Sequence, residues 1–333
     1  MDLSTKYLGF TLPHPLVPGA SPLGWHLDSI KRLEEAGAPL IQLPSLFEEQ
    51  IANEHFRQMQ DVDANEERYL ESVTYFPRQE EHRRAASERY LEHLQRVKEA
   101  VSVPVVASLN GTSIGGWVDF SRYLEEAGAD ALELNVYFVS ADLSEACGSV
   151  EQRVVDIMRE IRANVGIPIA VKLSQFFSSF PNLVTRLEAV GANGVVFFNR
   201  FYQTDIDVEA LAVLPRPQLS EPSELLLRLR FLALLSGRVG LSLACTGGCH
   251  SGTDALKAVM CGADAVQMVA ALLIHGPEHL AVVRGDMERW LEEHEYQSLA
   301  EAKGSMGLEH SPDPAAFERG NYIRIIEGGV RYI

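Results

Sequence analysis

Short apolar runs alternate with amphipathic segments along most of the chain. In one recurring pattern an amphipathic segment ends in Gly-Ala and an apolar run follows, as in residues 34–38 before residues 40–43. The glycine is expected just after a helix, where a positive φ is tolerated without a Cβ. Four or five apolar residues then predict a strand that is buried on both faces. The pattern recurs at residues 125–135, 188–199 and 260–268.

A second pattern, in which proline precedes the apolar run, alternates with the first. It occurs at residues 102–109 and 166–173, near the start at 16–18, and in a looser form without proline at 240–245. Proline ends a helix and marks the beginning of the next strand. The patterns predict eight strands that begin near residues 16, 40, 105, 131, 169, 194, 241 and 265. Helices are predicted over 26–36, 87–100, 118–127, 150–164, 181–190, 223–236, 252–261 and 278–293.

Strict alternation of buried strands and helices is typical of a parallel α/β sheet with right-handed crossovers. Eight such units that close on themselves make a (β/α)8 TIM barrel, which we predict over residues 1–295. Residues 296–333 would form a C-terminal extension packed on the barrel or on a partner. An open doubly wound sheet is the alternative, but no Gly-x-Gly-x-x-Gly follows the first strand. The connections after strands two and six, residues 44–87 and 200–222, are long enough to cover the barrel mouth as lids.

Polar residues stand at the carboxyl ends of the predicted strands, where barrels carry their active sites. Lys172 ends the fifth strand within an apolar run, and burial of its charge is costly. It therefore indicates an anionic partner or a functional amine, and a lysine that extends to solvent is the alternative. The amides of Asn135 and Asn199 can hold a planar heterocycle, although asparagine also caps turns. The full set is Ser21, Ser45, Asn110, Asn135, Lys172, Asn199, Thr246 and Gln267.

Gly247 and Gly248 form a turn after the seventh strand and open a helix. Backbone N–H groups at such a turn, together with the helix dipole, favour an anion. Barrels usually bind phosphate on the loops after strands seven and eight, so we predict a phosphate site here. A turn chosen only for its geometry is the alternative. Cys245 and Cys249 have no second pair at metal-ligand spacing, and we predict no metal site.

Composition and charge narrow the function classes. Hydrophobic residues make up 46% of the chain and charged residues 23%, as in globular proteins. The formal net charge of −17 repels phosphate backbones and anionic lipids, so we predict neither nucleic-acid nor membrane binding. The first residues show no signal-peptide pattern, and four scattered cysteines suit a reducing compartment. We expect a cytoplasmic protein that acts on a small molecule.

Several of these segments together resemble the dihydroorotate dehydrogenase family, nearest its soluble class 1 members. The similarity spans about residues 3–295 and rests on residues 14–21, 133–135, 171–173, 219–222, 246–248 and 262–267. It implies an FMN-dependent oxidoreductase linked to pyrimidine chemistry, and we also expect a homodimer. Catalytic roles would fall to Lys172, Asn135 and Asn199, with Lys172 at the flavin N1/O2 edge. The implied FMN contacts are Ala20, Ser21, Ser45, Asn135, Lys172, Asn199, Ser220, Thr246, Gly247, Gly248, Val269 and Ala270.

The chain departs from this family in the half of the site that would hold the substrate. The family's catalytic base, Cys or Ser, falls on Phe138, which cannot accept a proton. Ser140, Tyr137 and Cys147 lie in the same loop and are candidate substitutes. We therefore predict poor oxidation of dihydroorotate and a pocket that the Phe138 ring narrows. The alternatives are a non-catalytic flavin-binding accessory protein and a Schiff-base lyase that uses Lys172, the latter marked by a neighbouring acid and no flavin.

Overall fold

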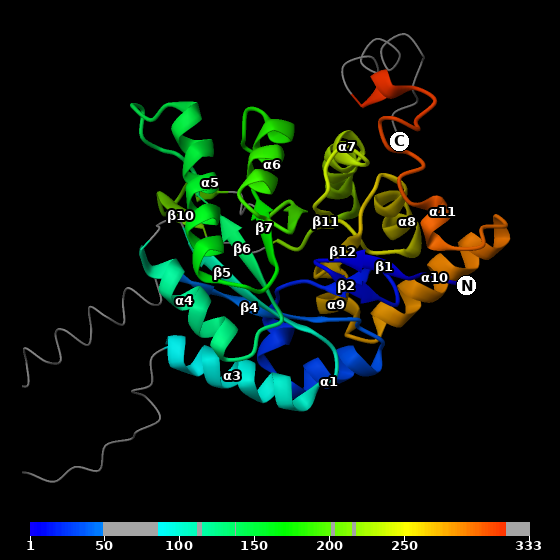
Figure 1. Cartoon of the computed structure of the whole chain (residues 1–333), viewed down its shortest axis with the longest axis horizontal. Coiled ribbons are helices and arrows are strands. Elements are labelled where there is room, and N and C mark those ends of the chain that lie inside the picture. The colour runs from blue at the N-terminus through cyan, green and yellow to red at the C-terminus, as the bar shows by residue number, and fades with distance from the viewer. Residues whose placement is uncertain (49–85, 112–114, 137, 201–203, 215–217, 318–333) are drawn as a thin grey trace, which may run out of the picture.

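Eight parallel strands form a single sheet at the centre of the protein (Figure 1). The computed structural model describes residues 1–48, 86–111, 115–136, 138–200, 204–214 and 218–317. The strand order is β3-β12-β11-β8-β7-β6-β5-β4, and the two end strands, β3 (Leu16–Pro18) and β4 (Ile41–Phe47), contact each other. The sheet is therefore a nearly closed barrel, and the predicted (β/α)8 architecture is confirmed. The other strands are β5 (Val105–Gly111), β6 (Ala131–Val136), β7 (Ile169–Leu173), β8 (Gly194–Phe197), β11 (Ser242–Thr246) and β12 (Ala265–Met268).

Helices surround the barrel and bury one apolar face each against it (Figure 1). The glycines that follow four of them, Gly37, Gly128, Gly191 and Gly262, have φ between +91° and +111°, as the Gly-Ala pattern predicts. The described helices from α1 to α8 are each followed by the next barrel strand, so this part of the chain alternates as expected, and α9, α10 and α11 follow the last strand. The helices are α1 (Leu27–Glu35), α3 (Ala86–Ala100), α4 (Gly115–Glu126), α5 (Cys147–Asn164), α6 (Phe180–Ala189), α7 (Leu225–Leu235), α8 (Gly252–Met260), α9 (Ala270–His275), α10 (His279–Glu293) and α11 (Leu299–Ala302).

A hairpin closes the amino-terminal end of the barrel. Its strands β1 (Thr5–Tyr7) and β2 (Phe10–Leu12) pair antiparallel ahead of the first barrel strand. Tyr7 and Leu12 are buried and pack against small or branched side chains of the barrel interior. This apolar plug fills the lower part of the barrel. A ligand therefore has to enter from the opposite end, where the strands end.

The second barrel strand is longer than the sequence predicts. β4 continues past Pro44 to Phe47, because a β-bulge between Gln42 and Ser45 accommodates the proline. After the bulge Ser45 is paired with Ser108 of β5. The strand thus delivers a polar side chain to the mouth of the barrel.

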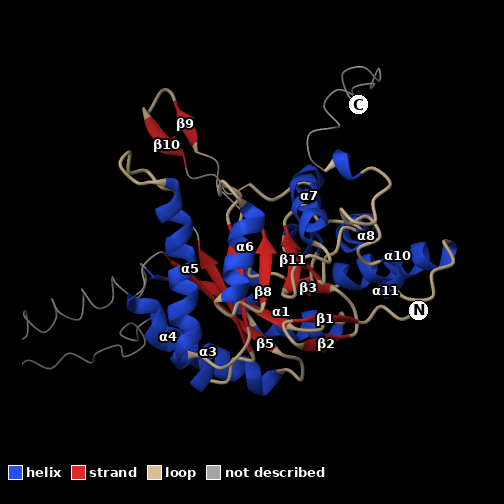
Figure 2. Ribbon diagram, turned by 45° about the horizontal axis from the view of Figure 1, so that its top comes forward, coloured by secondary structure: helices blue, strands red, loops and turns tan. Residues whose placement is uncertain are grey.

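The connection after the sixth barrel strand contains a second hairpin, made of β9 (Asp205–Asp207) and β10 (Ala212–Leu214). Figure 2 shows it projecting away from the barrel. The connection predicted after the second strand falls mostly on residues 49–85, which lie outside the described residues. The C-terminal extension contacts the barrel region, since Leu299 N–H donates to Asp2 O and Met306 N–H donates to Met260 O. In the part of the chain that the structure describes, no helix is both long and apolar enough to cross a membrane.

Candidate functional site

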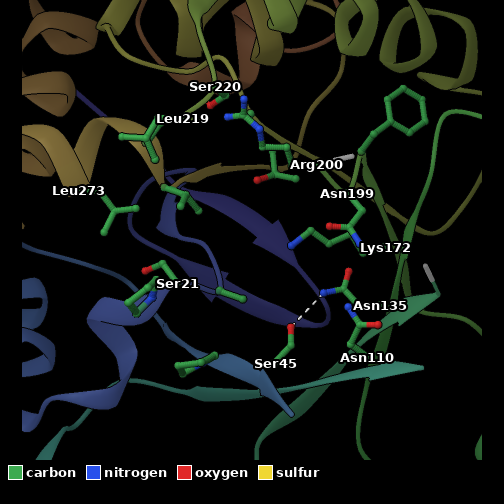
Figure 3. Close-up of a pocket in the computed structure, with 18 of the residues that line it drawn as sticks. Ser21, Ser45, Asn110, Asn135, Lys172, Asn199, Arg200, Leu219, Ser220 and Leu273 are labelled. Carbon is green, nitrogen blue, oxygen red and sulfur yellow. Dashed lines mark hydrogen bonds between the residues drawn. The ribbon is translucent and has the colours of Figure 1, made fainter. Parts of the chain in front are cut away.

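A cavity of about 570 Å³ opens at the carboxyl ends of the barrel strands (Figure 3). All the predicted FMN contacts except Gly248 line it. From the predicted lid after the sixth strand, Arg200, Gln218, Leu219 and Ser220 line the cavity, whereas the β9–β10 hairpin supplies none of the described lining residues. The other lining residues are Pro22, Trp25, Pro44, Phe47, Asn110, Phe198 and Leu273.

Lys172 extends into this cavity from the end of β7 (Figure 3). Its side chain is buried, and its ammonium Nζ donates to Glu133 Oε1 at 2.9 Å. Glu133 is buried in β6, at the position two residues before Asn135 and hence on the same inward face. The anionic partner that the buried lysine requires is therefore within the protein. From the sequence we expected the anionic partner of Lys172 to be a ligand, and we did not predict Glu133 in this role.

Asn135 is held in place by a row of hydroxyl groups. Its Nδ2 donates to Ser45 Oγ at 3.0 Å (Figure 3). Ser45 Oγ in turn lies 2.8 Å from Ser108 Oγ. The side-chain carbonyl, Oδ1, is buried and has no hydrogen-bond partner among the described residues. An unpaired buried acceptor costs free energy. This atom is therefore the best-defined acceptor in the cavity for an N–H group of a ligand.

The glycine turn after β11 is held by a hydrogen bond to the loop that carries Ser220. Gly247 and Gly248 have φ of +88° and +83°, which favours glycine at both positions. The Gly248 N–H donates to Ser220 Oγ at 3.2 Å, and this hydroxyl lies on a residue that lines the cavity. His250 Nε2 lies 2.7 Å from the Ser220 carbonyl oxygen and ties the two loops together. Gly247 borders the cavity, whereas Gly248 acts through Ser220.

Two arginines lie near this turn. Arg228 is buried, and its Nε–H donates to the Thr246 carbonyl at 3.0 Å. Burial lowers the pKa of Arg228, because desolvation disfavours the charged form. Glu224 lies 3.8 Å from Arg228 and 3.6 Å from Arg200. The charged residues among the described lining of the cavity, Lys172 and Arg200, are both basic, which suits an anionic ligand.

Phe138 does not lie in this cavity. It lines a separate cavity of about 510 Å³ between the loops after β6 and β7. The Arg153 guanidinium of α5 lies 4.7 Å from the centre of the Phe138 ring, and this cation–π contact holds the ring away from the barrel mouth. The prediction that Phe138 narrows the pocket is therefore wrong. Ser140 also lines the second cavity, where its hydroxyl donates to Glu145.

Among the described residues, the remaining candidates add no proton acceptor to the site. Tyr137 and the side chain of Cys147 lie outside the described residues. Gln267 does not line the cavity and is instead buried in the barrel interior. Cys245 and Cys249 are buried free thiols, and burial raises the pKa of Cys245 to about 12. A thiol with such a pKa stays protonated at neutral pH.

Comparison with known proteins decides the family. A family model for dihydroorotate dehydrogenase matches residues 82–291, which is more than half of the chain. The chain belongs to the dihydroorotate dehydrogenase family. A protein of Aeropyrum pernix provisionally named dihydroorotate dehydrogenase A (fumarate) is 29% identical over 220 residues, or 63% of this chain and 69% of that protein. The catalytic subunit of dihydroorotate dehydrogenase B (NAD(+)) from Thermoplasma acidophilum is 25% identical over 213 residues, or 63% and 70%.

Dihydroorotate dehydrogenase A (fumarate) of Limosilactobacillus reuteri is 30% identical over 197 residues, which cover 57% of this chain and 63% of that enzyme. Membership of the dihydroorotate dehydrogenase family supports an oxidoreductase activity. The similarity does not by itself identify the reacting molecule. The sequence prediction missed the charged groups Glu133, Arg200 and Arg228, and period-2 alternation in β6 was a signal that could have found Glu133.

Proposed function

We propose that this protein is an FMN-dependent oxidoreductase that acts on a CH–CH bond of a small ring compound, in the manner of dihydroorotate oxidation. The observation that carries the proposal is the buried, unpaired Asn135 Oδ1 in a cavity that also receives the Lys172 ammonium. Bound FMN would supply hydride acceptance at its ring. The protein would hold, orient and polarise the two reactants.

The residues present fit FMN at both ends of the cavity. Asn135 Oδ1 would accept a ring N–H, and Lys172 would donate to a ring oxygen or nitrogen. At the other end, the Gly247 backbone and the Ser220 hydroxyl face an anion with the Arg200 guanidinium nearby. The cavity volume of about 570 Å³ lies in the range of cofactor sites. The groups that would bind the heterocycle and the groups that would bind the phosphate thus lie at different ends of one cavity.

The first test is the visible spectrum of the purified protein. We expect a yellow protein that releases FMN on denaturation, identified by mass spectrometry. A colourless protein that also fails to bind added FMN at micromolar concentration would falsify the flavin assignment.

The second test concerns the substrate. With Phe138 at the family's base position and turned into the second cavity, we propose that dihydroorotate is oxidised poorly. A positioned base typically contributes about 10²–10⁴-fold to the removal of a proton. Anaerobic stopped-flow mixing with dihydroorotate should leave the flavin oxidised for seconds, whereas dithionite bleaches it. Rapid bleaching at millimolar dihydroorotate would show that another group of the chain serves as the base.

A Schiff-base lyase remains the second candidate, because Glu133 supplies the neighbouring acid that such a site requires. The ion pair argues against it, since a charged ammonium is not a nucleophile. Borohydride treatment in the presence of carbonyl compounds distinguishes the two functions. We expect no covalent adduct on Lys172, and an adduct found there by peptide mass spectrometry would favour the lyase. A bound flavin that no metabolite reduces would instead favour the accessory protein.

We also propose a homodimer in the cytoplasm. The β9–β10 hairpin exposes four apolar side chains, and an isolated two-stranded hairpin is marginally stable without a partner surface. A second copy of the chain would cover this face. Light scattering of the wild-type protein should give twice the chain mass, and Leu211→Asp together with Val213→Asp should shift it to the monomer. A wild-type monomer would contradict this proposal. The apolar residues are Ile206, Val208, Leu211 and Val213.

A further inference from the structure

We propose that Glu133 is a positioning residue that balances the charge of Lys172 and so sets the reduction potential of the flavin. The inference rests on the flavin site proposed above and deepens it. Glu133 does not line the cavity, and it acts on a ligand only through Lys172 from the layer beneath. Its role is therefore distinct from that of the residues that contact the ligand.

Glu133 lies at the centre of a hydrogen-bond network inside the barrel. Its side chain is 1% exposed and that of Lys172 is 6% exposed. Glu133 Oε1 accepts from Lys172 at 2.9 Å, and Oε2 accepts from Gln267 Nε2 at 2.5 Å. Gln267 Nε2 also donates to Gln42 Oε1 at 3.0 Å. Two donors facing two oxygens suit a carboxylate, which can only accept.

The network spans strands that are not neighbours in the sheet. Gln42, Glu133 and Gln267 come from β4, β6 and β12, so their hydrogen bonds cross the barrel interior. The interior layers below are apolar and contain, for example, Val106, Ala170 and Ala265. The polar layer therefore lies between an apolar plug and the cavity. Among the described residues of this network, only Lys172 lines the cavity.

Fold stability alone is a weak reason for such a pair. Desolvation of two charges offsets most of their mutual attraction, and apolar residues of similar volume often stabilise a core as well or better. The position of the pair at the layer that borders the cavity indicates a role toward the ligand instead. Lys172 extends into the cavity and offers its remaining N–H groups there (Figure 3). Glu133, which lies in the layer beneath, opposes the charge of Lys172.

This arrangement has a definite electrostatic consequence. A flavin gains negative charge when it is reduced, so Lys172 stabilises the reduced form and Glu133 opposes that stabilisation. If Glu133 loses its charge while Lys172 keeps its own, the attraction is no longer opposed. The reduction potential should then rise. If Lys172 loses its charge instead, Glu133 acts alone and the potential should fall.

The test is a reductive titration of the FMN-loaded protein in the presence of a reference dye. For Glu133→Gln we expect the affinity for reduced over oxidised flavin to increase about tenfold, which equals about 30 mV for a two-electron couple. Glu133→Asp keeps the charge and should stay within about threefold of wild type. Glu151→Gln is the matched control, because Glu151 is also a buried carboxylate but lines the second cavity, and we expect no change.

If Glu133→Gln does not fold, two other variants carry the test. Lys172→Gln should lower the potential, and the double variant Lys172→Gln/Glu133→Gln, which removes both charges, should raise it again. The proposal is overturned if the reduction potential does not change between wild type and Glu133→Gln, or between Lys172→Gln and the double variant. In either case the proposed binding of FMN is unaffected. If the wild-type protein binds no FMN at all, the proposed function and this inference both fail.

Discussion

The glycine turn after β11 offers a sharp test of how backbone geometry builds the ligand site. A Cβ added to Gly248 would lie 2.5 Å from the Leu225 backbone nitrogen and 3.0 Å from the Glu221 carbonyl oxygen. Real Cβ atoms do not approach backbone so closely, so Gly248→Ala has to displace the segment that begins α7. The same segment follows Ser220, whose hydroxyl accepts from the Gly248 N–H.

Two costs combine in this variant. The positive φ of +83° disfavours alanine by about 1–2 kcal/mol. Overpacking against backbone adds about 1–3 kcal/mol. Gly9 provides a matched control, because its φ is +84° but an added Cβ would meet nothing within 4 Å. Gly9→Ala should therefore show the conformational cost alone, and the difference between the two variants isolates the close approach.

Urea unfolding of the flavin-free proteins measures both costs, and quenching of flavin fluorescence measures FMN affinity. We expect Gly248→Ala to lose about 2–5 kcal/mol of unfolding free energy and Gly9→Ala about 1–2 kcal/mol. FMN affinity should fall at least about tenfold for Gly248→Ala, equivalent to about 1.4 kcal/mol, and stay unchanged for Gly9→Ala. Equal destabilisation by the two variants would refute the close-packing argument, and unchanged FMN affinity in Gly248→Ala would place the phosphate elsewhere.

Three further outcomes can be checked. Burial lowers the pKa of His14 from 6.5 to about 4, so the unfolded state binds more protons between these pH values and stability falls as the pH decreases through this window. Between pH 6.5 and 5.0, the unfolding free energy measured in urea should fall by about 1.5 kcal/mol less in His14→Gln than in wild type. Asn135→Leu should weaken FMN about tenfold in a fluorescence titration, while Asn164→Leu on α5 leaves it unchanged. Arg228→Leu should lower unfolding free energy by about 2–3 kcal/mol in urea, since the Thr246 carbonyl loses its charged donor.

The barrel could be predicted because its signals are local. The Gly-Ala junctions at residues 37, 128, 191 and 262 and the proline junctions at residues 104 and 168 mark where one helix ends and the next strand begins. The eight barrel strands start within one residue of the predicted positions. The errors arise where tertiary structure overrides the local pattern. Pro44 predicts the end of a strand, but β4 continues beyond it because a β-bulge accommodates the proline. The β9 and β10 strands are three residues each, which is too short for an alternating pattern to show.

The residues of the candidate site also fall into those that local sequence signals predict and those that they do not. Residues at strand ends, such as Asn135 and Lys172, are placed by the barrel itself, so their convergence follows from the topology. Glu133 could not be paired with Gln267 from sequence, because β6 and β12 are separated by three strands in the sheet. The orientation of Phe138 depends on Arg153, fifteen positions further on, through a contact that no local pattern records.

This division bears on how one fold can keep a cofactor and change its substrate. The groups proposed for FMN stand on strand ends and on a glycine turn, which the Ser220 hydroxyl and the close approach of the Glu221 and Leu225 backbone hold in place. Phe138, which we propose to occupy the family's base position, stands on a connection between β6 and α5, and its ring lines a separate cavity beside Arg153. A substitution in such a connection leaves the strand ends unmoved, because the barrel hydrogen bonds do not pass through it. The cofactor half of the site can therefore persist while the chemistry of the substrate half changes.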